Sequence, residues 1–166
     1  MAVTSLIRIA GVLKPLPRSA IAGLVVTASL LVSVAGYEGY REFAYTPVSG
    51  DVSTIGFGTT RGVKPGDKTT PVASLERALK DIEEFDKAIK GCVKVPLHQN
   101  EYDAYLSMAY NIGSGAFCSS TLVKELNLQR YEEACKEILR WDKFKGKPLP
   151  GLTKRRQAEY NTCIGK

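Results

Sequence analysis

The sequence predicts an α+β protein that is mostly helical, carries one small β-hairpin and begins with an apolar N-terminal helix. Residues 19–37 carry no charge, residues 36–60 are rich in glycine, threonine and aromatic residues, and helical periodicity recurs from Pro71 onward. With 166 residues, 44% of them apolar, the chain is long enough for one domain and too short for two. We therefore divide it into an N-terminal segment, 1–37, and one folded domain, 38–166.

The uncharged run from Ser19 to Tyr37 has the length of a membrane-crossing helix. As a helix it would span about 28 Å, against a hydrocarbon core of about 30 Å. Arg8, Lys14 and Arg18 precede it, so the positive-inside tendency places the N-terminus in the cytoplasm and the folded domain outside. Ten of its nineteen residues are Ala, Gly, Ser or Thr, and eight are Ile, Leu or Val. Such a helix is weakly held, and we expect a signal anchor that can leave the membrane again.

Two other interpretations of this segment remain open. Ser33-Val34-Ala35 resembles the small-x-small cleavage site of a secretory signal peptide. Cleavage there would leave Glu38 close to a new N-terminus, where it would be poorly positioned. The segment would otherwise be a buried core helix of a cytosolic protein.

The remaining elements follow from turn signals and periodicity. Ser49-Gly50-Asp51 marks a turn between two extended runs, which predicts a short hairpin. From Pro71 to Lys90, apolar residues recur every three or four positions and Gly91 ends the pattern; they are Leu75, Leu79, Ile82, Phe85 and Ile89. Further helices are expected at 99–111, 120–126, 131–141 and 152–163, separated by 113–115 and 145–151.

Charge and cysteine content limit the partners and the compartment. The net charge of +6 is scattered, so it does not indicate nucleic acid binding; it suits an anionic wall polymer, or simply aids solubility. Four cysteines without close spacing suit an oxidising compartment. Among three connectivities we favour Cys92 with Cys118 and Cys135 with Cys163, because each closes a moderate loop; four buried thiols are the alternative.

No metal site is indicated, since the sole histidine, His98, has no Cys or carboxylate cluster at ligand spacing and suits a surface or capping role.

Two carboxylates flank the predicted hairpin. Glu38 directly follows the apolar run, so part of its surroundings should be dry, which favours the protonated form of a carboxylic acid. Asp51 lies at the turn. Hydrolysis of a glycosidic bond needs an acid to protonate the leaving oxygen and, usually, a second carboxylate to handle water or positive charge.

A set of short motifs resembles the phage-type lysozymes, glycoside hydrolase family twenty-four. The first block is Glu38-Gly39, Ala44-Tyr45, Gly50 and the run from Thr54 to Thr60. The second comprises Pro96-Leu97, Gln99, Tyr102-Asp103-Ala104, Asn111-Ile112-Gly113, Phe117 and Ser120-Thr121-Leu122. The third comprises Arg140-Trp141, Gly151-Leu152 and the run from Arg155 to Glu159. Together they cover nearly all of the chain from Gly36 onward.

The resemblance implies a lysozyme-like fold and roles for particular residues. Glu38 would be the general acid, while Gly56, Gly58, Asn111 and Gly113 would contribute to substrate binding. The pattern has an Asp nine residues after the Glu, where this chain has Pro47, and a Thr six residues beyond that Asp.

We assign the role of the missing carboxylate to Asp51, with Thr54 helping to position water. Structural roles are the alternatives: Asp51 as a turn residue, Thr54 as a strand former and the two glycines of the hairpin as turn residues. Thr59 stands where the family often has His. Trp141 suits the core better than sugar stacking. Arg155-Arg156 suit a solvated helix face with one structural ion pair better than a contact with the carboxylates of the wall.

With an uncleaved weak anchor, the resemblance is to the signal-arrest-release endolysins. It implies a muramidase that cuts the β-1,4 bond between N-acetylmuramic acid and N-acetylglucosamine in peptidoglycan. The enzyme would be tethered inactive in the host inner membrane through residues 19–37 and then released to the periplasm. No cofactor is expected, and the protein is expected to be a monomer. A lytic transglycosylase of the same fold and a non-catalytic, membrane-anchored wall-binding protein are the alternatives.

Overall fold

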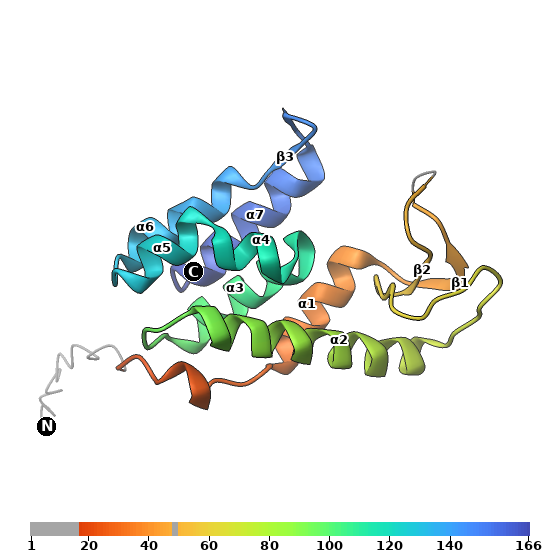
Figure 1. Cartoon of the computed structure of the whole chain (residues 1–166), viewed down its shortest axis with the longest axis horizontal. Coiled ribbons are helices and arrows are strands. Elements are labelled where there is room, and N and C mark those ends of the chain that lie inside the picture. Colours follow the sequence, from red (N-terminus) through yellow and green to blue (C-terminus); the bar gives the residue numbers. More distant parts are fainter. Residues whose placement is uncertain (1–16, 48–49) are drawn as a thin grey trace, which may run out of the picture.

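The computed structural model describes residues 17–47 and 50–166. Figure 1 shows a helical body and, at one end, a small lobe that holds strands β1 (Arg41–Tyr45) and β2 (Thr54–Gly56). The long helix α2 (Pro71–Cys92) runs from the lobe into the body, and helix α1 (Ala28–Glu38) ends where the lobe begins. The predicted mostly helical α+β architecture with a small hairpin is therefore confirmed.

The N-terminal segment is not the single helix that we predicted for residues 19–37. A short 3-10 helix, η1 (Ile21–Gly23), is followed by extended chain, and α1 begins after Thr27. The Thr27 hydroxyl caps α1 by accepting a 3.1 Å hydrogen bond from the Leu30 N–H. No helix among the described residues combines the length and the apolar character of a membrane span. The predicted cytoplasmic tail lies largely outside the described residues.

Contacts with the body explain why the segment is not one helix. Ser19 forms an antiparallel bridge with Leu97, which requires extended backbone. The carbonyl of Leu24 accepts a 2.8 Å hydrogen bond from Lys90 Nζ. Leu30 and Val34 are buried in the core, where α1 packs on α2 and α3. Tertiary contacts thus override the local helical preference of the apolar run.

The predicted hairpin is formed by β1 and β2. The strands are antiparallel, with Arg41 opposite Gly56, Tyr45 opposite Thr54 and an irregular register between these pairs. Gly50, in the connection, has a φ of 88°, which suits the predicted turn. The hairpin begins three residues after Glu38, so it extends directly from the end of α1.

The helices after the hairpin agree closely with the periodic pattern. Thr70 caps α2 and Pro71 occupies its first turn. The other expected helices are α3 (Gln99–Ile112), α5 (Thr121–Asn127), α6 (Tyr131–Glu137) continued by the 3-10 helix η2 (Ile138–Arg140), and α7 (Pro150–Cys163).

Two elements lie where the sequence predicted only loops between helices. A short helix, α4 (Ser114–Ser119), occupies the glycine-rich stretch, and a second small hairpin pairs β3 (Lys143–Phe144) with β4 (Lys147–Pro148). Phe117 of α4 is buried, so packing stabilises a helix that its glycines disfavour locally.

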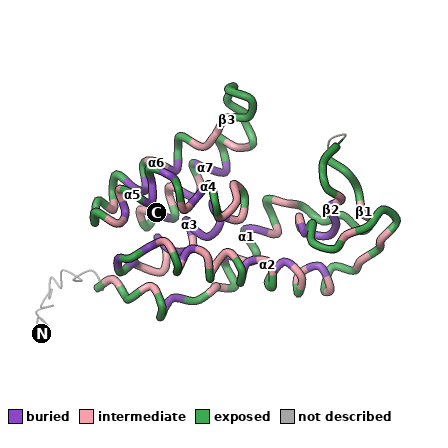
Figure 2. The backbone as a smooth tube through the Cα atoms, viewed as in Figure 1, coloured by how far each residue is buried: buried purple, intermediate pink, exposed green. Residues whose placement is uncertain are grey.

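The core is centred on α3, whose middle is buried on nearly all sides; Figure 2 shows this buried stretch between the other helices. Trp141 packs at the edge of this core, as favoured. Both preferred disulfides are present: Cys92–Cys118 joins α2 to α4, and Cys135–Cys163 joins α6 to α7, with Cα–Cα distances of 5.7 and 5.8 Å.

Candidate active site

Glu38 is the last residue of α1, at the junction between the helical body and the small lobe. Gly39 follows with a φ of 69°, a left-handed backbone conformation that glycine adopts readily and that ends the helix. The Glu38 side chain is 25% exposed, and its Oε1 lies 2.9 Å from Arg155 Nη1. The carboxyl is thus half-buried, fixed through one oxygen and reachable from solvent.

Arg155, on α7, holds Glu38 in place. Its side chain is only 6% exposed, and its Nε donates to Glu159 Oε1 at 3.1 Å. Its Nη2 donates to the Ser107 carbonyl of α3 at 3.2 Å, and its guanidinium lies 4.6 Å from the ring centroid of Tyr37. Since separate nitrogens are held by separate partners, the guanidinium has a defined orientation.

A buried charge network continues behind Arg155. Arg156 is fully buried, and its Nε lies 2.9 Å from Glu159 Oε2. Burial raises the pKa of the Glu159 carboxyl and lowers the pKa of the Arg156 guanidinium. The prediction that Arg155 and Arg156 lie on a solvated helix face is therefore wrong, although the structural ion pair expected of them is present. Both arginines are buried because Glu159, three and four residues along α7, provides the opposite charge.

The small lobe approaches Glu38 through Gly58. A Cβ added at Gly58 would lie 3.1 Å from Glu38 Oε2, and Gly58 has a φ of 87°. A side chain here would press on the carboxyl and strain the backbone. The preceding carbonyl, of Phe57, accepts a 3.1 Å hydrogen bond from the Tyr110 hydroxyl of α3, which ties this loop to the body.

Gly56 and Thr54 of β2 are buried against the lobe's own framework. A Cβ at Gly56 would lie 2.6 Å from Ser74 Oγ of α2, so this glycine allows close packing of strand on helix. The Thr54 hydroxyl donates to the Val52 carbonyl at 3.3 Å. The Thr59 hydroxyl, at the position where the family often has His, donates to Asp81 Oδ2 of α2 at 2.6 Å.

Asp51 is exposed in the connection between β1 and β2. Within the part of the chain that the structure describes, no hydrogen bond or ion pair joins it to Glu38.

Asn111 and Gly113 lie at the end of α3. The Asn111 side-chain oxygen accepts a 2.9 Å hydrogen bond from Arg156 Nη2, which links the site network to this end of the helix. Gly113 has a φ of 89° and joins α3 to α4. Of the predicted site residues, Gly58 therefore lies beside Glu38, and Asn111 is connected to it through Arg156, Glu159 and Arg155.

The histidine of this chain lies at a helix start rather than in a cluster of possible metal ligands. His98 precedes α3, and its backbone N–H donates to Glu101 Oε2 at 2.8 Å, so it belongs to a helix start, as favoured. In residues 17–47 and 50–166 no group of three or more His, Cys, Asp or Glu side chains is arranged to hold a metal. A half-buried carboxyl at the junction of a helical body and a small β lobe is a site at which a carboxylic acid could protonate a glycosidic oxygen, the chemistry of a glycoside hydrolase.

Comparisons with known proteins identify the family. The phage lysozyme family model matches residues 35–159. An endolysin of Acyrthosiphon pisum secondary endosymbiont phage 1 is 44% identical over 133 residues, covering 78% of this chain and 90% of that protein. A SAR-endolysin of Pseudomonas phage phiKMV is 36% identical over 141 residues, covering 82% and 87%. The solved endolysin from Escherichia coli O157:H7 phage FAHEc1 matches with a TM-score of 0.76 and 32% identity, covering 86% and 95%. The chain belongs to the phage lysozyme family, whose members are glycoside hydrolases that degrade peptidoglycan.

Sequence reasoning missed the arginine that fixes Glu38 and the glutamate behind it. Arg155 is 117 residues from Glu38, so no local pattern connects them. The available signal was the spacing within α7, where Glu159 follows Arg155 by four residues and Arg156 by three. Two arginines sharing one carboxylate on a helix indicate a built network rather than a solvated face.

Proposed function

We propose that Glu38 is the general acid of a muramidase and protonates the glycosidic oxygen between N-acetylmuramic acid and N-acetylglucosamine. The observation that carries this is the asymmetric setting of its carboxyl: Oε1 is held by Arg155, while Oε2 lies beside the bare backbone of Gly58. Oε2 is therefore the oxygen that can present a proton to a sugar. Arg155 forms ion pairs with both Glu38 and Glu159, so one cation serves two carboxylates. Glu38 is therefore held in place without having a cation to itself.

We propose that Asp51 is the second carboxylate of the reaction, which orients the attacking water or stabilises positive charge, and that Thr54 helps to position this water. Asp51 is exposed, and Thr54 is buried at the start of β2, two residues after the exposed Val52. Asp51→Asn should then lower kcat by about a hundredfold, as loss of a general base does, whereas a pure turn residue would leave kcat within twofold of wild type.

The chemistry of the product tests the proposed reaction. Purified wall glycan would be digested with the protein, and the released sugars would be weighed by mass spectrometry. Hydrolysis adds one water to each cut and leaves a reducing end, whereas a lytic transglycosylase leaves an anhydro sugar. Reducing ends support the muramidase, anhydro sugars support the alternative, and binding without cutting supports a wall-binding module.

We also propose that the protein is tethered to a membrane before it becomes active. Residues 19–37 would first span the host inner membrane, with the N-terminus in the cytoplasm, and the folded arrangement described above would be the released, periplasmic form. The phiKMV relative, which is named a SAR-endolysin, and the uncharged sequence of residues 19–37 support this. Cell fractionation with intact-mass measurement tests it: protein of one unchanged mass should move from the membrane to the soluble fraction, and a shorter soluble form would indicate a cleaved signal peptide instead.

A further inference from the structure

The N-terminal segment lies on the body and buries only part of its apolar surface before α1 begins. Leu24 is 5% exposed, but Val25 is 60% exposed, and Ser19, Ala20 and Gly23 are also exposed. Apolar burial in residues 19–27 is therefore provided by Leu24, with Ile21 and Val26 packed partly against the core. Because apolar packing is not directional, specific polar contacts also fix the path of this stretch.

Two side chains on the first turns of α3 provide such contacts. Gln99 pairs with the backbone of Val25 in both directions: its Nε2 donates to the Val25 carbonyl at 2.9 Å, and its Oε1 accepts from the Val25 N–H at 3.4 Å. Asp103 Oδ2 accepts a 2.8 Å hydrogen bond from the Thr27 hydroxyl. Gln99 and Asp103 are four residues apart on one helix face, and Gln99 Nε2 also donates to Asp103 Oδ1 at 2.8 Å.

Thr27 connects this pair to the catalytic end of α1. The same hydroxyl that donates to Asp103 caps α1 by accepting from the Leu30 N–H. Glu38 is the last residue of that eleven-residue helix. One end of α1 is thus held by Thr27 on Asp103, and the other by Glu38 on Arg155, so the helix axis is defined at both ends.

We propose that Gln99 and Asp103 are positioning residues for the reaction, a receptor on α3 that seats residues 25–27 and thereby sets the position of the Glu38 carboxyl. The proposal rests on Glu38 being the general acid. Neither residue needs to touch substrate. The pair acts through Thr27 and α1. Without it, the N-terminal end of α1 would keep its apolar packing and the more distant contacts at Ser19, Arg18 and Lys90, and among the described residues it would lose the side-chain hydrogen bonds that α3 makes to Val25 and Thr27.

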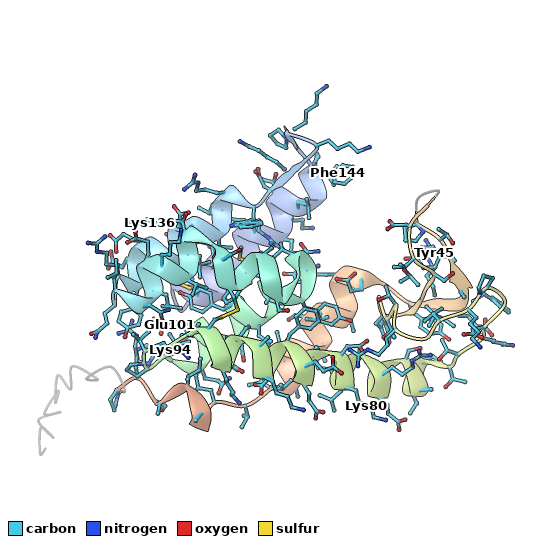
Figure 3. The ribbon with its side chains drawn as sticks, viewed as in Figure 1. Tyr45, Lys80, Lys94, Glu101, Lys136 and Phe144 are labelled. Carbon is cyan, nitrogen blue, oxygen red and sulfur yellow. A yellow bond between two sulfur atoms is a disulfide. The ribbon has the colours of Figure 1, made fainter. Side chains whose placement is uncertain are left out.

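The distant contacts cannot replace the pair. Arg18 forms an ion pair with Glu101, with 2.6 Å between Nη2 and Oε1, and Figure 3 shows Glu101 in the body, far from Tyr45 of the small lobe. Eight residues separate Arg18 from Thr27, and most of them are exposed. This ion pair therefore keeps the segment near the body without fixing the start of α1.

The test changes only α3, so the sequence of the N-terminal segment stays intact. Full-length Gln99→Ala, Asp103→Ala and the double variant would be compared with wild type for kcat, KM and amide hydrogen exchange of residues 25–38. Asn100→Ala is the matched control, because Asn100 lies on the same helix but donates to the carbonyls of Thr162 and Cys163. A hydrogen bond of ordinary strength shifts an equilibrium about fivefold.

We expect each single variant to lower kcat at least fivefold and the double variant at least tenfold, with KM within twofold of wild type and faster exchange confined to residues 25–38. Asn100→Ala should keep wild-type kcat even if it lowers the melting temperature equally. Wild-type kcat in the double variant, or equal loss in Asn100→Ala, would overturn the proposal. Glu38→Gln, measured in parallel, separates the two hypotheses: if it stays active, the proposed acid is wrong, whatever the α3 variants do.

Discussion

Replacing Arg155 with methionine removes the cation that lies between Glu38 and Glu159 while keeping a side chain of similar length. Breaking a buried ion pair costs about 3–5 kcal/mol, because the remaining charge stays buried without its partner. Most of this cost falls on Glu159, whose side chain is 2% exposed and which would keep one cation, Arg156, and the hydrogen bond from the Ser107 hydroxyl. Glu38, at 25% exposure, can recover hydration, so we expect the lower end of the range, about 3 kcal/mol.

Chemical denaturation of Arg155→Met and of Arg140→Met provides the comparison. Arg140 pairs with Glu137 at the surface with 68% of its side chain exposed, and such pairs contribute about 1 kcal/mol or less. At about 2–4 °C per kcal/mol for a domain of this size, Arg155→Met should melt roughly 6–12 °C below wild type.

At a temperature where Arg155→Met and Arg140→Met are both folded, kcat of Arg155→Met should be at least tenfold below wild type, since Glu38 loses the contact that orients it. Equal stabilities for the two variants, or a fully active Arg155→Met, would refute the reasoning that the buried network supports the site.

Three further outcomes follow from particular contacts. Gly58→Ala should lower kcat far more than Gly62→Ala, although both glycines have positive φ, because a Cβ only at Gly58 meets Glu38; equal kcat values would contradict this. Removal of the Cys92–Cys118 disulfide by Cys92→Ser, with its partner also replaced, should cost about 3 kcal/mol in urea denaturation, since the crosslink spans 26 residues; a loss under about 1 kcal/mol would contradict it. Burial raises the pKa of Asp103, so the folded state holds its proton more tightly and this group's contribution to stability falls as pH rises through the raised pKa. Asp103→Asn should therefore gain stability relative to wild type as pH rises above the ordinary aspartate pKa of about 4 and through the raised pKa, and a constant difference would count against it.

Much of the architecture is predictable from periodicity and turn chemistry. Helix α2 begins at Pro71 and ends within two residues of the expected Lys90, because its cap and apolar face are both local signals. The hairpin and the pairing of the four cysteines also follow from local signals and loop length. The extent of the N-terminal helix was not predictable in the same way, since the bridge between Ser19 and Leu97 joins residues far apart in sequence.

The site shows the same division between local and long-range signals. Glu38 and Gly58 could be selected from short motifs, and the structure brings them together. The prediction for Arg155 failed because its burial depends on three partners contributed by α1, α3 and α7. The role of Asp51 stays a prediction, because an exposed carboxylate in a hairpin connection has no contact that defines its function.

The most direct test of the central claim is the rate at which Glu38→Gln clears cells stripped of their outer membrane. Glutamine keeps the size of the side chain and an oxygen for Arg155, so the fold should be retained, as circular dichroism and the melting temperature would verify. The account predicts that clearing by the folded variant falls at least a thousandfold, roughly the upper range of what a positioned general acid contributes. A folded Glu38→Gln that clears cells at the wild-type rate would contradict it.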